Sequence, residues 1–257
     1  MSIRHLDPDW IVPDWPAPPG VRAVCTTRAG GVSAGPYASL NLGDHVGDVP
    51  ASVAANRQRL AQAIGARPVF LRQVHGTGVA VLDAGMADDT EADAACTGDA
   101  GLACTVMVAD CLPVLFTDAQ GRRVAAAHAG WRGLAAGVLA RAAQSFEGDD
   151  GRHPELMAWL GPCIGPDAFE VGDEVKAQFE AADADASRCF KPAGAPGKWL
   201  ADLPALARQR LRALGVRQIH GNDGSAAWCT VSNPSRFFSY RRERVGGRLA
   251  ALVWRER

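Results

Sequence analysis

The chain has 257 residues, 47% of them hydrophobic and 21% charged, which suffices for a sizeable core in one large domain or two small ones. Its formal net charge of −1 at pH 7 offers no electrostatic attraction to nucleic acid or an anionic membrane, so we expect neither as a partner. The seven cysteines are an odd number without close pairing, which argues against a disulfide framework and favours reduced thiols in a cytoplasmic protein.

The first residues lack the apolar stretch of a signal peptide, and the segment 1–20, rich in proline and tryptophan, is expected to run over the surface in extended form. A short strand over 21–26 and a long loop over 27–48 follow. Pro50 begins a predicted amphipathic helix that continues to about residue 64.

The middle of the chain is predicted to be rich in strands. Segments 69–74 and 79–82 flank a glycine-containing tight turn at 76–78, and further strands are expected at 102–109, 114–117 and 123–127. The last two are joined by residues 118–121, a hairpin signal. The longest apolar run, 102–116, is interrupted by Asp110 and Pro113 and is too short to span a bilayer.

The second half alternates helices and strands. Helices are predicted over 134–146, over 175–180 with Asp173 as N-cap, and over 203–214 with Asp202 as N-cap and Gly215 after the C-terminus. Strands are predicted at 156–160, 216–219 and 249–253. This mixture indicates an α/β or α+β layered fold.

Three residues at the ends of apolar runs are candidate metal ligands, namely His75, Cys111 and His128. Each lies within two residues of a glycine or proline, so each backbone turns at a sheet edge, where sites gather. Three imidazole and thiolate ligands leave the fourth position of a tetrahedral zinc open, as in catalytic sites. Taken alone, each also has an ordinary interpretation as a core residue, because the spacing is not a local zinc motif.

The loop after the first strand is a candidate anion site. Arg28 has a planar group suited to phosphate or carboxylate, and Gly30 and Gly31 expose backbone N–H groups. Arg57 in the following helix is a second candidate anion ligand, and Asn41 is a candidate substrate ligand, as is His45. An ordinary tight turn explains the two glycines equally well.

Two further segments carry reactive or aromatic side chains. Cys163 lies in a rigid loop with two Gly-Pro pairs and is a candidate nucleophile only if a base lies near it; a structural turn is the simpler interpretation. Residues 237–242 place aromatic side chains beside two arginines, which either stack on a base and contact a phosphate or pack against the C-terminal strand.

Seven motifs, in order, resemble those of one known family: TRAGGVS (27–33), SLNLG (39–43), QVHG (73–76), ADCLP (109–113), HAGWRG (128–133), GPCIG (161–165) and FFSYRR (237–242). The chain is similar to the YfiH/LACC1-type proteins, also called the peptidoglycan editing factor or polyphenol oxidase (laccase domain) family. The resemblance extends from Val21 to Trp254.

This resemblance implies a single catalytic domain over 1–257, a mixed-sheet sandwich flanked by helices, with zinc bound by His75, Cys111 and His128. It implies phosphorolysis of adenosine, inosine, guanosine and S-methyl-5′-thioadenosine, plus deamination of adenosine. The laccase label implies copper and phenol oxidation, and the editing label implies hydrolysis of a wrongly aminoacylated cell-wall precursor. Family membership alone does not choose among these reactions.

Residue counts and chemistry favour the nucleoside activity. A multicopper laccase needs on the order of ten histidines, and the chain has six. Zinc with an open position activates water for deamination, and Arg28, alone or with Arg57, would hold phosphate. Asp110 is a candidate acid/base, or alternatively orients His75 or His128. A two-histidine, one-cysteine set also binds copper, so copper can be acquired in vitro.

Two other classes remain open from the sequence. In a cysteine hydrolase, Cys111 would be the nucleophile and a neighbouring histidine its base. In a non-enzymatic metal-dependent binding protein, zinc would be present without turnover. No exposed heptad or apolar stripe indicates a dimer interface, so we expect a monomer whose partners are a nucleoside and phosphate.

Overall fold

The computed structural model describes residues 6–147 and 154–257. Of the segment 1–20 that was expected to be extended, residues 1–5 therefore lie outside the described ranges. Residues 6–20 contain no helix or strand, apart from a single bridge between Ile11 and Cys25. Within the described ranges, every helix is too short or too polar to cross a membrane.

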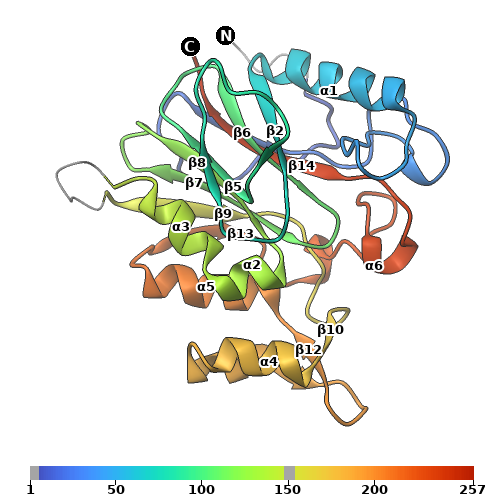
Figure 1. Ribbon diagram of the computed structural model, residues 1–257, viewed down its shortest axis with the longest axis vertical. Helices are drawn as coiled ribbons and strands as arrows, with labels where there is room; N and C mark the ends of the chain where they lie inside the picture. Colours follow the sequence, from blue (N-terminus) through green and yellow to red (C-terminus); the bar gives the residue numbers. More distant parts are fainter. Residues whose placement is uncertain (1–5, 148–153) are drawn as a thin grey trace.

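Two β-sheets face each other in the centre of the molecule (Figure 1). The five-stranded sheet has the order β1-β14-β6-β2-β4, in which β2 is parallel to both β6 and β4 and the other pairs are antiparallel. Its strands are β1 (Val21–Cys25), β14 (Leu249–Arg255), β6 (Leu102–Val108), β2 (Arg67–Arg72) and β4 (Thr90–Glu91).

The six-stranded sheet has the order β13-β9-β7-β8-β5-β3, with parallel pairs at its two edges and antiparallel pairs in its centre. Its strands are β13 (Gln218–Gly221), β9 (Leu156–Leu160), β7 (Leu112–Asp118), β8 (Val124–Ala129), β5 (Ala94–Thr97) and β3 (Val79–Val81). Fully buried side chains such as Val106, Leu115 and Val253 pack between the two sheets. The expected mixed-sheet sandwich is confirmed.

Helices cover the outer faces of both sheets (Figure 1). Leu60 and Ile64 of α1 (Pro50–Ile64) pack on the five-stranded sheet, and the helix has the predicted bounds because Pro50 starts it and Gly65, in the left-handed conformation, ends it. The six-stranded sheet is covered by α2 (Trp131–Ala136), α3 (Val138–Gln144) and α5 (Leu203–Ala213).

A smaller unit projects from the lower end in Figure 1. It contains a three-stranded antiparallel sheet, α4 (Asp173–Glu180) and the 3₁₀ helix η2 (Ala184–Cys189); the strands, in the order β10-β12-β11, are β10 (Glu170–Gly172), β12 (Lys198–Ala201) and β11 (Phe190–Pro192). The remaining short helices are η1 (Gly35–Tyr37), η3 (Ala226–Trp228) and α6 (Tyr240–Glu243).

Three local predictions were wrong. The helix predicted over 134–146 is divided into α2 and α3 by Gly137, whose φ is +99°. Asp173 is the first residue of α4 and Gly172 is the N-cap; the Asp173 carboxylate accepts a hydrogen bond from Trp199 Nε1 at 2.6 Å instead of capping the helix. The tight turn predicted at 76–78 is absent: the segment bends at His75 and Gly76 and then crosses from β2 to β3, which belong to different sheets.

The predicted cap of α5 is confirmed. Asp202 accepts a hydrogen bond from the backbone N–H of Ala205 at 2.8 Å, and Gly215 follows the helix with φ +82°. The predicted hairpin between β7 and β8 is also present.

Candidate functional site

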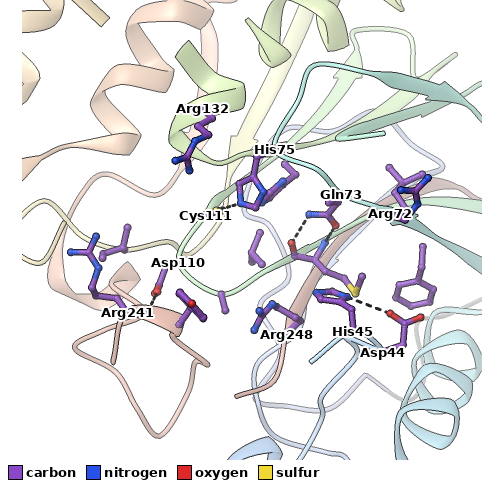
Figure 2. Close-up of a pocket in the computed structure, with 18 of the residues that line it drawn as sticks. Asp44, His45, Arg72, Gln73, His75, Asp110, Cys111, Arg132, Arg241 and Arg248 are labelled. Atoms are coloured by element: carbon purple, nitrogen blue, oxygen red, sulfur yellow. Dashed lines mark hydrogen bonds and ion pairs between the residues drawn. The ribbon is translucent and has the colours of Figure 1, made fainter. Parts of the chain in front are cut away.

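His75, Cys111 and His128 lie together, with one candidate ligand atom of each within 4.8 Å of the others (Figure 2). Cys111 Sγ is 3.7 Å from His75 Nε2, and the two imidazole rings meet edge to face with centroids 4.8 Å apart. His128 is buried, Cys111 is half-buried and His75 is exposed, so the cluster is open on one side. The predicted convergence of these three residues is therefore present.

Two of the three residues lie in segments between strands, and the third lies inside a strand. His75 lies in the segment that leads from β2 to β3, and Cys111 lies in the turn between β6 and β7. Both segments cross from the five-stranded to the six-stranded sheet, whereas His128 lies inside β8. His75 itself has a φ of +62°, an uncommon conformation for a residue with a side chain.

Asp93, which the sequence analysis did not single out, connects two of the three residues. Its Oδ1 atom lies 2.8 Å from His128 Nδ1 and accepts a hydrogen bond from the His75 backbone N–H at 2.9 Å. Its Oδ2 atom accepts from the N–H groups of Val74 and Gly76, at 3.2 and 2.6 Å. A fully buried carboxylate thus fixes the His75 turn and orients the His128 ring so that Nε2 faces the cluster.

The ionisation of the cluster follows from these contacts. Burial raises the pKa of the Cys111 thiol, but the charges and hydrogen bonds of His128 and His75 outweigh it and lower this pKa from 9.0 to about 6. Burial lowers the pKa of His128, but Cys111 and Asp93 outweigh it and raise this pKa from 6.5 to about 9. Cys111 is therefore available as a thiolate, the form that binds metals and acts as a nucleophile.

The arrangement fits a bound metal ion. Among residues 6–147 and 154–257 it is the one group of three or more histidine, cysteine or acidic side chains with converging ligand atoms. Gly130 leaves space beside it, because a Cβ atom there would lie 2.8 Å from His75 Cδ2 and 3.0 Å from Cys111 Sγ. Two imidazoles and a thiolate match the ligand set of catalytic sites with one open position.

A cavity of about 680 Å³ opens in front of the cluster, and its lining is strongly cationic. Six arginines and three aspartates line it. Arg57 and Arg72 form ion pairs with Asp44 and Glu91, at 3.1 and 2.9 Å. Within the part of the chain that the structure describes, no carboxylate pairs with the guanidinium groups of the other four, which are Arg132, Arg241, Arg244 and Arg248.

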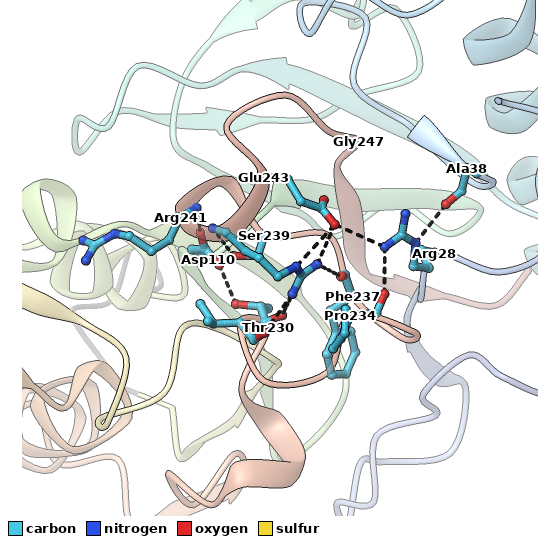
Figure 3. Close-up of polar contacts among 12 residues, drawn as sticks. Arg28, Ala38, Asp110, Thr230, Pro234, Phe237, Ser239, Arg241, Glu243 and Gly247 are labelled. Carbon is cyan, nitrogen blue, oxygen red and sulfur yellow. Dashed lines mark hydrogen bonds and ion pairs between the residues drawn. The ribbon is translucent and has the colours of Figure 1, made fainter. Parts of the chain in front are cut away.

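Arg28, the expected anion ligand, does not line this cavity. Its guanidinium donates hydrogen bonds to Ala38 O and Pro234 O at 2.8 and 2.7 Å and pairs with Glu243 at 3.5 Å (Figure 3). The neighbouring Gly31 N–H is bound to Ser39 Oγ. Arg28 thus connects the loop over residues 27–48 to Pro234 and Glu243, and its Nε and Nη1 atoms are already used within the protein.

Asn41, the expected substrate ligand, is also internal. It is fully buried, and its side-chain amide bonds to both backbone groups of Gly43 and to Asp48. Arg57 does line the cavity, although its guanidinium already donates to Leu42 O and pairs with Asp44. His45 lines the cavity as expected.

Asp110 lines the cavity, but both of its carboxylate oxygens have partners. Oδ1 accepts from Thr230 Oγ1 and Oδ2 accepts from the backbone N–H of Arg241, each at 2.6 Å (Figure 3). The alternative role expected for Asp110, orienting a histidine, belongs to Asp93 for His128. Asp110 instead fixes the C-terminal segment beside the cavity.

The remaining candidates divide between core and cavity. Cys163 is fully buried, and burial raises the pKa of its thiol well above 9.0, so it lacks the character of a nucleophile. Phe237 and Phe238 are fully buried, whereas Tyr240 and Arg241 line the cavity. The packing interpretation of the 237–242 motif therefore holds for Phe237 and Phe238, and contact of Tyr240 and Arg241 with a base or a phosphate stays a prediction.

The family described as multi-copper polyphenol oxidoreductase laccase matches residues 22–256. The chain belongs to this family. A protein of Pseudomonas aeruginosa named purine nucleoside phosphorylase is 53% identical over 95% of this chain and 98% of its own length. The purine nucleoside phosphorylase YfiH of Escherichia coli is 51% identical over the same shares.

Solved structures of family members have the same fold. A Neisseria meningitidis protein that is 46% identical superimposes with a TM-score of 0.88 and covers 97% of this chain and 100% of its own. YlmD from Geobacillus stearothermophilus, 32% identical, has a TM-score of 0.85 and covers 94% of each chain. The resemblance stated from the motifs is therefore confirmed, and so is the fold that it implied.

Proposed function

We propose that the protein is a zinc-dependent purine nucleoside phosphorylase that acts on adenosine, inosine, guanosine and S-methyl-5′-thioadenosine and also deaminates adenosine. The names of relatives with about half of their residues identical support the first activity. The observation that carries the proposal is the open cluster of His75, Cys111 and His128 at the wall of a cationic cavity.

His75, Cys111 and His128 would hold the zinc ion, and His128 is already oriented for this by Asp93. When bound, zinc supplies Lewis-acid polarisation and makes an oxygen ligand nucleophilic near neutral pH. Deamination needs such a nucleophile, and in phosphorolysis the attacking phosphate oxygen would be oriented at the same zinc. Both activities would therefore use one site.

In phosphorolysis, a phosphate oxygen forms a bond to C1′ of the ribose while the bond from C1′ to the base nitrogen breaks. The electron pair of that bond goes to the purine, which takes up a proton. The arginines without carboxylate partners compensate the phosphate charge, and Trp131, Phe169 and Tyr240 provide aromatic surface for the base. A cavity of about 680 Å³ accommodates a nucleoside together with phosphate.

A second candidate function is hydrolysis of an amide-like bond, as in editing of a cell-wall precursor. The series Cys111, His128 and Asp93 has the order of nucleophile, base and orienting carboxylate found in cysteine hydrolases. Multicopper oxidation is disfavoured, because the chain has six histidines and the cluster within the described ranges uses two of them.

The decisive experiment combines elemental analysis with an assay for base release from adenosine and inosine, with and without phosphate. About one zinc per chain and phosphate-dependent release support the phosphorylase. Zinc without release favours hydrolysis, which is then tested by release of an amino acid from a cell-wall precursor. Full activity of a metal-free preparation that stoichiometric alkylation of Cys111 abolishes supports the cysteine hydrolase. Ammonia release from adenosine tests the deaminase activity separately.

We also propose a cytoplasmic monomer. All seven cysteines are free thiols, which suits a reducing compartment. Size-exclusion chromatography with light scattering tests the monomer, and cell fractionation tests the location.

A further inference from the structure

We propose that Arg248 forms the phosphate-binding subsite of the cavity, beside Cys111, and that the loop over residues 41–43 holds it in place. That the anion bound there is inorganic phosphate rests on the proposed phosphorolysis. It replaces the role expected of Arg28, which does not line the cavity and whose Nε and Nη1 atoms bind other parts of the protein.

The guanidinium group of Arg248 is fixed on one side and free on the other. Its Nη1 atom donates to Gly246 O and Gly247 O, at 3.2 and 3.1 Å. Its Nε and Nη2 atoms have no hydrogen-bond partner within the described ranges, and neither is a buried unpaired atom. These two atoms form the edge of an arginine that binds an oxyanion with two parallel hydrogen bonds.

The loop over residues 41–43 is shaped around Arg248. A Cβ atom on Gly43 would lie 2.7 Å from Arg248 Cγ, so the stem of the arginine packs directly on the glycine backbone. Asn41 Oδ1 accepts hydrogen bonds from the backbone N–H groups of Arg248 and Gly43, both at 2.9 Å. The conformation of this loop therefore determines where Arg248 lies, which gives Asn41 a positioning role.

Nearby carboxylates are engaged elsewhere and leave Arg248 unpaired. Asp44 pairs with Arg57 at 3.1 Å and with His45 at 3.4 Å. Asp110 accepts hydrogen bonds through both oxygens from Thr230 and Arg241. An arginine whose charge is not compensated inside a cavity favours an anionic ligand.

Arg248 lines the same cavity as His75, Cys111 and His128. Burial lowers the pKa of its guanidinium, and the charges of Cys111 and Asp110 oppose this shift. In Figure 2 Arg248 lies on the other side of Cys111 from Arg132, on the same wall as His45. An anion on its free edge therefore lies in the cavity beside the candidate metal ligands.

The test measures binding of inorganic phosphate by equilibrium dialysis in four proteins with measured metal content and thermal stability. These are the unaltered protein, Arg248→Gln, Arg248→Lys and Arg72→Gln. We expect Arg248→Gln to raise the dissociation constant about tenfold or more, because it removes two charge-assisted hydrogen bonds. Arg248→Lys keeps the aliphatic stem and the charge but lacks the planar guanidinium edge. We therefore expect its dissociation constant for phosphate to lie between those of the unaltered protein and Arg248→Gln.

Arg72→Gln is the matched control, because it removes one positive charge from the same cavity lining. The Arg72 guanidinium is exposed and paired with Glu91, so we expect a change within about twofold. The subsite is refuted if Arg248→Gln, or a folded Arg248→Lys in its place, binds phosphate like the unaltered protein. It is also refuted if Arg72→Gln weakens binding equally, or if the unaltered protein binds no phosphate.

Kinetics separate this subsite from the proposed function. Phosphate binding that depends on Arg248, without phosphate-dependent release of purine, supports the subsite and refutes the phosphorylase. Phosphate-dependent release with an unchanged KM for phosphate in Arg248→Gln refutes the subsite and supports the phosphorylase.

Discussion

Replacing Asp93 with asparagine tests how the cluster is assembled. The carboxylate has four contacts, to His128 Nδ1 and to the backbone N–H groups of Val74, His75 and Gly76. An asparagine keeps one accepting oxygen and replaces the other by an NH₂ group. Because that group cannot accept hydrogen bonds, the donors that faced one carboxylate oxygen lose their partner in a fully buried position.

The magnitude follows from these contacts. A buried hydrogen bond to a charged group contributes about 1.5–3 kcal/mol, and breaking a buried ion pair costs about 3–5 kcal/mol. We therefore expect Asp93→Asn to lower the free energy of unfolding by about 3–5 kcal/mol. We also expect it to lower metal affinity by about 10–100-fold, as is typical for the partner of a metal-binding histidine.

Asp118→Asn is a control for general destabilisation. Asp118 is also buried, and it accepts hydrogen bonds from the backbone N–H groups of Gln120 and Arg122 in the turn between β7 and β8. Chemical denaturation measures stability, and competition with a chromophoric chelator measures metal affinity. The reasoning would be refuted if folded Asp93→Asn bound metal as tightly as the unaltered protein, or if Asp118→Asn lost affinity equally.

Three other predictions test the site and its surroundings. Cys111→Ala removes one of the three ligands, and elemental analysis and base-release assays should show loss of both metal and activity; full metal-free phosphorolysis by this variant contradicts the assignment. Gly130→Ala places a Cβ atom 2.8 Å from His75 Cδ2, so chelator competition should show weakened metal binding in a folded protein, and unchanged affinity would contradict the close contact. Burial raises the pKa of Asp48, but hydrogen bonds from Ser33, Asn41 and Val49 outweigh this effect and hold the pKa below 3.8. The Asp48 carboxylate therefore stabilises the fold fully above pH 3.8, and this contribution is lost as the pH falls through the lowered pKa. The difference in unfolding free energy between the protein and Asp48→Asn should therefore shrink on acidification, whereas a difference independent of pH would show that the carboxylate charge is not responsible.

Local signals in the sequence account for the predictions that were confirmed. The bounds of α1 follow from Pro50 and Gly65, and the cap of α5 follows from Asp202. The three cluster residues could be found because chemically distinctive side chains follow or end apolar runs. Each of these signals is contained in a few consecutive residues.

Partners distant in sequence explain what could not be predicted. Arg28 was expected to face a ligand, but its partners Pro234 and Glu243 lie 206 and 215 residues later in the chain. Asp93 was missed because a single aspartate before an apolar strand has no distinctive neighbours, and His128 lies 35 residues away. Arg248 likewise depends on Asn41, 207 residues earlier.

The two crossings between the sheets have a kinetic consequence. His75 and Cys111 lie on the segments that connect the five-stranded to the six-stranded sheet, so the three ligand atoms converge only after both sheets have docked. Such long-range contacts form late in folding because they require costly loop closure. During refolding from denaturant, the absorption of a cobalt-thiolate bond at Cys111 should therefore appear after the secondary structure, as a spectroscopic signal of sheet docking.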